Sequence, residues 1–165
     1  MRALFTPAVA LAVVGSPVQA LSCLPTDAVT TFSAMTAESE GFILLHGTLD
    51  FDTSTLPAFI ETEPTPAPAP IDATFTGTEL ITTGESAVMT IPATLQITCA
   101  GPWCGTASSG QEAVIFAAGD TDAIDVFVGP CGGQVFYDPT PEMIAALTTC
   151  LQDGACSAEH LQQTD

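Results

Sequence analysis

Residues 41–52 read Gly-Phe-Ile-Leu-Leu-His-Gly-Thr-Leu-Asp-Phe-Asp, a strongly apolar stretch that changes to apolar–polar alternation at Leu49 and Phe51. A short apolar run is typical of a buried β-strand, and alternation is typical of a strand with one buried face. We therefore predict a strand here.

Further strand signals follow closely along the chain. Residues 73–82 and 86–99 are rich in Thr, Val and Ile, and Gly84-Glu85 between them predicts a hairpin turn. Pro92 has no N–H to donate, which predicts an edge position or a bulge in the second strand. Three shorter strands are predicted at residues 112–118, 123–128 and 133–137.

A helix is predicted at each end of this region. Residues 26–40 have apolar side chains near helical spacing, with Thr26 or Asp27 as the cap. Thr140-Pro141-Glu142 has the capping hydroxyl, first-turn Pro and acid that begin a helix. Five or six strands with two terminal helices predict a mainly β fold, a small closed or nearly closed barrel, with a β-sandwich as the alternative.

The N-terminus has the features of a secretory signal. Met1-Arg2 is basic, residues 8–15 are apolar, and Val18-Gln19-Ala20 has small side chains at the cleavage positions. We expect residues 1–20 to be removed, with cleavage after Ser22 as the alternative. The apolar run is too short for a bilayer-spanning helix, so no membrane span is expected after signal removal.

The remaining residues 21–165 have the length of one disulfide-stabilised domain. Residues 57–70 contain alternating prolines, which block helix and central strand and predict an extended loop inside that domain.

Charge excludes several classes of partner. The 165 residues include 19 Asp and Glu but one Lys or Arg, and the formal net charge is −18. That one base is Arg2, so signal removal would change the side-chain charge from −18 to −19. A chain without cationic side chains cannot neutralise phosphates, which excludes nucleic acid and anionic membrane surfaces as partners.

Six cysteines indicate an oxidising compartment. An even number behind a signal sequence is typical of disulfide-bonded proteins, which places this chain in the periplasm or outside the cell. The Cys99/Cys104 and Cys150/Cys156 pairs are close enough to form local loops. Cys23 would then pair with Cys131, although other connectivities stay open.

Short motifs suggest a family. The first predicted helix is preceded by Ser22-Cys23-Leu24-Pro25 and followed by the predicted strand at residues 41–47. The predicted 123–128 strand is followed by Pro130-Cys131-Gly132-Gly133-Gln134-Val135-Phe136, and the last predicted helix contains Cys150. In this order of elements the chain resembles the netrin-like class of oligonucleotide/oligosaccharide-binding (OB) barrels. That class includes the tissue inhibitors of metalloproteases and small bacterial secreted relatives.

The resemblance implies binding or inhibition instead of catalysis. In the metalloprotease inhibitors an N-terminal Cys presents its amino group and carbonyl to the protease zinc. Here only Cys23 could do so, and only after cleavage at Ser22. The Cys-x-Cys start of those inhibitors is absent, because Leu24-Pro25 follows Cys23.

No catalytic residue is predicted. The chain has no Gly-x-Ser-x-Gly motif. Its two histidines are interpreted as a hydrogen-bonded strand residue, His46, and a surface residue, His160. Cys99 and Cys104 are two positions further apart than a Cys-x-x-Cys redox motif, so a structural disulfide is expected there. We predict a protein that is not an enzyme.

Two other features leave alternatives. Asp120, Asp122 and Asp125 resemble the start of a calcium loop but lack its Gly and distal Glu, so solvated turn carboxylates are expected, with calcium as the one candidate ligand and no other cofactor. Trp103 is expected to be buried against the neighbouring disulfide, with an exposed binding anchor as the alternative.

The expected function is therefore an exported, non-enzymatic binding protein for an unknown protein or other ligand. The alternatives are an acidic cation-binding or envelope structural protein, and a protease inhibitor that acts through its N-terminus.

Overall fold

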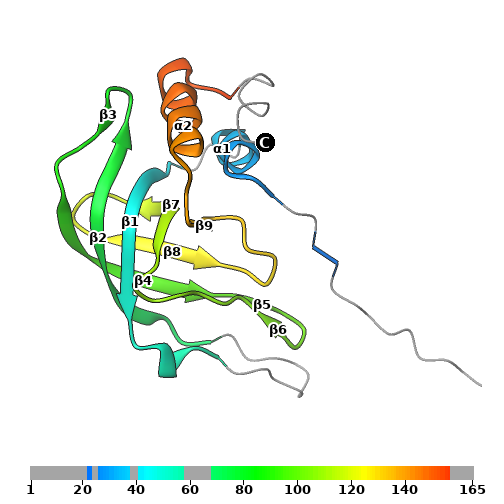
Figure 1. Cartoon of the computed structure of the whole chain (residues 1–165). Helices are drawn as coiled ribbons and strands as arrows, with labels where there is room; N and C mark the ends of the chain where they lie inside the picture. The colour runs from blue at the N-terminus through cyan, green and yellow to red at the C-terminus, as the bar shows by residue number, and fades with distance from the viewer. Residues whose placement is uncertain (1–21, 24–25, 38–40, 58–67, 157–165) are drawn as a thin grey trace, which may run out of the picture.

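The protein is mainly β, with one helix before the strands and one after them (Figure 1). The structure, a computed structural model, describes residues 22–23, 26–37, 41–57 and 68–156. The proposed signal, most of the Pro-rich segment and His160 lie outside these residues.

Five strands form a closed barrel. They are β1 (Ile43–Phe51), β2 (Ile71–Ile81), β4 (Met89–Ile97), β8 (Ile124–Val128) and β7 (Glu112–Gly119), and β1 closes the ring by pairing with β7 as well as β2. All neighbours are antiparallel except β4 and β8, which run parallel. The predicted barrel is confirmed, and the sandwich alternative is wrong because β1 has neighbours on both edges.

Two short strands lie outside the ring. β3 (Gly84–Glu85) pairs with the end of β2, and β9 (Val135–Tyr137) pairs with the first half of β7. β7 pairs with β8 only at Ala118–Asp125 and Gly119–Ile124. β7 therefore divides one edge between β8 and β9.

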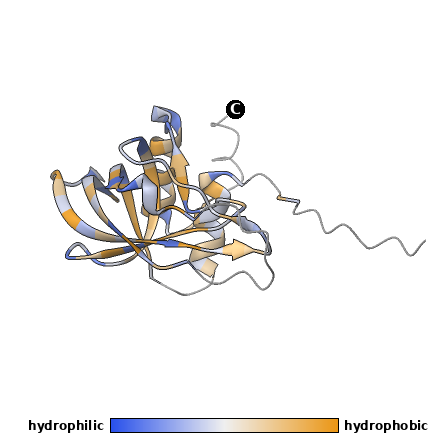
Figure 2. Ribbon diagram, turned by 90° about the horizontal axis from the view of Figure 1, so that it is seen from below, coloured by the Kyte–Doolittle hydropathy of each residue, from blue (hydrophilic) through white to orange (hydrophobic). Residues whose placement is uncertain are grey.

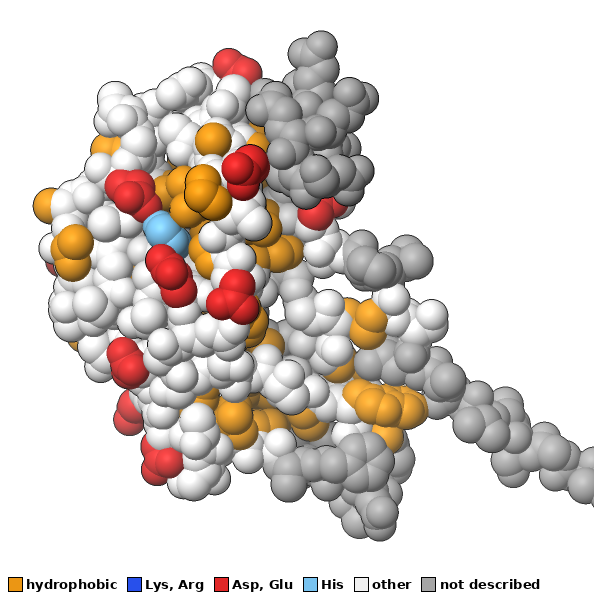
Figure 3. Space-filling model, in the orientation of Figure 1, with side chains coloured by type: hydrophobic (Ala, Val, Ile, Leu, Met, Phe, Trp, Pro, Cys, Tyr) orange, Lys and Arg blue, Asp and Glu red, His pale blue; other side chains and the backbone are white. Residues whose placement is uncertain are grey.

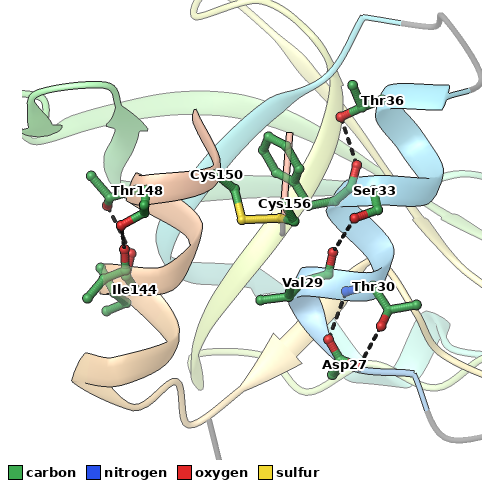
Figure 4. Close-up of a disulfide and its surroundings, with 12 residues drawn as sticks. Asp27, Val29, Thr30, Ser33, Thr36, Ile144, Thr148, Cys150 and Cys156 are labelled. Atoms are coloured by element: carbon green, nitrogen blue, oxygen red, sulfur yellow. Dashed lines mark hydrogen bonds between the residues drawn. A yellow bond between two sulfur atoms is a disulfide. The ribbon is translucent and has the colours of Figure 1, made fainter. Parts of the chain in front are cut away.

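The two helices lie side by side against the outside of the barrel (Figures 1 and 4). In α1 (Ala28–Ala37), the carboxylate of Asp27 accepts hydrogen bonds from the N–H and hydroxyl of Thr30. α2 (Pro141–Asp153) begins as the sequence predicts: Thr140 is its N-cap, and the Thr140 hydroxyl accepts the Met143 N–H at 3.2 Å. This cap fixes where α2 starts above the barrel.

Apolar residues form two separate layers. Odd-numbered residues of β1, such as Leu45 and Leu49, point into the barrel, whereas Leu44 points outward and packs beneath the helices. In β7 all five residues from 113 to 117 are buried, because one face lines the barrel and the other lies under α1 and α2. Figure 2 shows the apolar and polar residues alternating along the barrel strands.

Two facing glycines let β1 and β2 approach closely. Gly47 is paired with Gly77, and a Cβ at Gly47 would lie 2.2 Å from the Thr76 carbonyl oxygen. The ring of the fully buried Phe75 covers the same point. Only glycine fits there, immediately after His46.

Three disulfides stabilise the fold, and they are the pairs expected from the sequence. Cys23 is bonded to Cys131, Cys99 to Cys104 and Cys150 to Cys156. The first ties the chain before α1 to the segment after β8. The last lies between α2 and α1 (Figure 4). Their presence supports an oxidising environment.

One local prediction was wrong, and for Pro92 the bulge is wrong whereas the edge position holds locally. The β2–β3 turn lies at residues 82–83, and Gly84-Glu85 is itself strand β3, because Leu80 and Ile81 pair with it. β4 runs through Pro92 without a bulge, since its register with β2 is continuous. The missing N–H of Pro92 is tolerated because the pairing of β4 with β8 begins one residue later, at Ala93.

One element was not foreseen. Cys99–Ala100 (β5) and Trp103–Cys104 (β6) form a separate two-stranded hairpin that extends from β4, with the two cysteines directly opposite each other. The disulfide therefore links the two strands of the hairpin.

Candidate functional site

His46 lies on the outer face of β1, at the edge of the helix layer. Its neighbours in register are Thr78 of β2 and Val114 of β7. Even-numbered positions of β1 face away from the barrel interior, and Leu44, one such position earlier, is already covered by the helices. His46 is only partly covered, with 17% of its side chain exposed.

Two carboxylates flank the His46 ring. Glu85 of β3 places Oε1 2.6 Å from Nδ1, and Glu112 of β7 places Oε1 3.0 Å from Nε2. The first contact is a hydrogen bond. The second is close but not in hydrogen-bond geometry, and Nε2 is buried without a hydrogen-bond partner. Because a carboxylate only accepts, the first hydrogen bond places a proton on Nδ1.

These three residues form one side of an open groove, which we call the His46 groove. Its volume is about 350 Å³, and the other side is made by Pro139, Pro141 and Ile144 at the start of α2. Figure 3 shows the histidine in pale blue between acidic side chains in red, with apolar side chains beside them. The groove therefore combines negative charge with an apolar wall.

The hydrogen bond to His46 lowers the pKa of Glu85 below its ordinary value of 4.5. Burial opposes this shift, while the charge of His46 and a hydrogen bond from the Thr78 hydroxyl at 3.2 Å make smaller contributions that add to it. Glu85 is thus held in its ionised form at neutral and mildly acidic pH.

The charge of the groove favours a ligand with a positive group. Both carboxylates can accept hydrogen bonds, and they remain 43% (Glu85) and 64% (Glu112) exposed, so a ligand can reach them. No Lys or Arg of the described residues competes for them. A cation with an apolar stem would contact Glu85 and Glu112 with its charge and the prolines with its stem.

The barrel interior is not a comparable site. A cavity of about 10 Å³ lies at the end of the barrel near Leu49, Phe51 and Tyr137. That volume is about enough for one water molecule. A ligand inside the barrel would have to displace core side chains.

The predicted calcium candidates, Asp120, Asp122 and Asp125, lie in and after the turn between β7 and β8. The Asp120 carboxylate accepts the N–H of Asp122 at 2.8 Å, and the Asp125 carboxylate accepts a hydrogen bond from Gln96 at 3.4 Å. Among the described residues, no group of three or more His, Cys, Asp or Glu is placed to hold a metal ion.

The expectation that Trp103 is buried against the neighbouring disulfide is wrong. Trp103 is 37% exposed instead of buried, because the β5–β6 hairpin projects from the barrel and offers no core to cover the ring. His46 has its hydrogen bond as expected, but its partners Glu85 and Glu112 were not foreseen.

Neither α1 nor α2, the helices of the described part of the chain, has the length and apolar character needed to cross a membrane.

Comparison with known proteins gives no match: no family model, no curated protein and no solved structure is significantly similar to the chain. The site must therefore be interpreted from its own chemistry.

Proposed function

We propose that the protein is an exported, non-enzymatic binding protein whose His46 groove takes up a basic side chain of a partner protein. The observation that carries the proposal is the pair of exposed carboxylates on either side of His46, opposite an apolar wall. Complementary charge across an interface steers encounter and selects partners. With a net charge of −18, the chain would attract a basic partner.

An arginine side chain fits the groove better than a lysine. Its planar guanidinium has five N–H donors and can bond to two carboxylates at once, whereas a lysine ammonium is a compact point charge. Glu85 and Glu112 line the same groove, so the donors of one arginine could contact either or both of them. The aliphatic stem would then lie against Pro139, Pro141 and Ile144.

The test is an NMR titration with N-acetyl-arginine amide, a probe with one positive charge, at constant ionic strength. We expect shifts in the backbone signals around Glu85, Glu112 and Ile144, and weaker binding of N-acetyl-lysine amide. The double variant Glu85→Gln/Glu112→Gln should lose most of the affinity.

A matched control separates the groove from the general negative charge. Asp72→Asn/Asp153→Asn removes two charges from exposed positions outside the groove and should bind the probe nearly as well as the wild type. Equal loss in both double variants, or shifts spread over the whole surface, would contradict the proposal.

We also propose that the chain belongs to the netrin-like class of OB barrels. This assignment is supported by the small closed barrel, the two helices packed on its outside and the Cys23–Cys131 link. This class of fold is consistent with binding instead of catalysis.

Inhibition of a protease through the N-terminus is the second candidate. It is favoured by Cys23, which is exposed and fixed to the barrel through Cys131. N-terminal sequencing of the exported protein tests it: a chain that begins at Leu21 excludes the mechanism, and one that begins at Cys23 should inhibit a zinc protease. The cation-binding alternative gains no support from the described residues, where no metal-holding group occurs.

A further inference from the structure

We propose that protonated His46 competes with the ligand for Glu85 and Glu112, so that protonation of this one side chain weakens binding in the His46 groove. The inference rests on the proposed function and adds its regulation. It follows from the position of His46 between the two carboxylates that the ligand would use.

The described residues contain no Lys or Arg, so His46 is the side chain among them that can become a cation. With a neutral imidazole, Nδ1–H donates to Glu85, and the lone pair of Nε2 faces Glu112 across 3.0 Å. That second contact is repulsive, which leaves Glu112 free for an external cation. The cluster then has two negative charges.

Protonation of His46 would change the contact between Nε2 and Glu112 from repulsive to attractive. An Nε2–H would face the Glu112 carboxylate, and the imidazolium would attract both carboxylates at once. The cluster charge falls from −2 to −1, and an incoming guanidinium meets a like charge between its two partners. Binding of the external cation and of the proton are therefore negatively coupled, and the coupling is reciprocal.

The remaining neighbours of His46 do not titrate in the same range. β2 contributes Thr78, whose one hydroxyl hydrogen can be donated either to Glu85 at 3.2 Å or to the His46 carbonyl oxygen at 3.4 Å. The wall from Pro139 to Ile144 contributes no ionisable lining residue. Glu85 stays ionised above pH 4.5 because its pKa is held below that value.

The experiment measures the affinity of N-acetyl-arginine amide by NMR at about pH 7.5 and about pH 5.5, at constant ionic strength. We expect the wild type to bind about fivefold more weakly at the lower pH, a coupling at the lower end of the usual range. His46→Gln should bind with nearly equal affinity at both pH values. His160→Gln, the matched control, should behave like the wild type.

A second measurement does not depend on the variant. In a pH series, adding the probe to the wild type should move the His46 imidazole ¹⁵N signals toward those of the neutral ring. Calorimetry in two buffers of different ionisation enthalpy should show proton release on binding.

The outcomes separate the two proposals. Binding that is equal at both pH values, or that falls equally in His46→Gln, would overturn the competition and leave the groove as the binding site. Absence of probe binding to the groove at both pH values would overturn the proposed function and this inference together.

Discussion

The imidazole Nδ1 of His46 lies 2.6 Å from Oε1 of Glu85, a contact that joins a barrel strand to the short strand β3 outside the ring. Glu85 also accepts a hydrogen bond from Thr78 of β2. One carboxylate thus connects β1, β2 and β3 at the rim of the groove, and its protonation should affect both stability and binding.

Glu85 should contribute to acid sensitivity. Because its folded pKa is below the ordinary value of 4.5, its stabilising effect is fully present above pH 4.5 and is lost as the pH falls through the folded pKa. We expect Glu85→Gln to flatten the decline in thermal stability below pH 4.5. Thermal unfolding measured by circular dichroism across this range checks it; a decline as steep as in the wild type would contradict the assignment.

Gly47→Ala should be strongly destabilising. The new Cβ would lie 2.2 Å from the backbone oxygen of Thr76 and 2.6 Å from Cα of Gly77, so the paired strands would have to separate. Overpacking of this kind costs about 1–3 kcal/mol, sometimes more. Urea unfolding measures the loss. Gly41→Ala is the control, since nothing lies within 4 Å of its added Cβ, and it should change the free energy of unfolding little.

Thr140→Ala should loosen the apolar wall of the groove. The Thr140 hydroxyl accepts the Met143 N–H, and an N-cap of this kind contributes about 1 kcal/mol. The same loss should weaken binding of the arginine probe, because Pro141 and Ile144 lie in the first turn of α2.

Thr149→Ala provides the comparison within the same helix. The Thr149 hydroxyl is exposed and donates to the Ala145 carbonyl oxygen inside α2. Alanine is the better helix former, so this variant should be as stable as the wild type or slightly more so. A loss as large as that of Thr140→Ala would argue against the capping role.

The disulfides should differ in their contribution to stability. Cys23 and Cys131 are 108 positions apart, whereas Cys99 and Cys104 are 5 apart. On the chain-entropy estimate, removing the first costs about 5 kcal/mol and removing the second about 2 kcal/mol. Denaturant unfolding of the two Cys-to-Ser double variants checks this order; the reverse order would show that local packing, not chain entropy, decides.

The strands and helices could largely be predicted because their signals are local. The Thr140-Pro141-Glu142 start of α2 and the apolar run of β1 each lie within a few neighbouring residues. For Pro92 the sequence could not decide between an edge and a bulge, because the choice depends on where β8 begins to pair with β4. The turn predicted at Gly84-Glu85 was misplaced because Gly84, with a φ of +119°, begins strand β3 and lies after the turn.

The groove could not be predicted in the same way. His46 and Glu85 are 39 positions apart, and Glu85 lay in what was predicted to be a turn. Glu112 reaches the ring only because β7 pairs with β1 in the register that sets His46 against Val114. Such contacts depend on strand register. Alternation in the sequence indicates which face of a strand is buried, but not which strand lies beside it.

The uneven division of β7 between β8 and β9 has a consequence for how the ring moves. Two residue pairs hold β8 to β7, whereas β8 pairs with β4 over five. The helix-side cluster takes its strand residues from β1, β2, β7 and β9. If the ring opens locally, it opens at this seam, and β8 stays attached to β4, which is itself held to β2 by seven residue pairs. Native-state hydrogen exchange should then show the lowest protection where β7 and β8 meet.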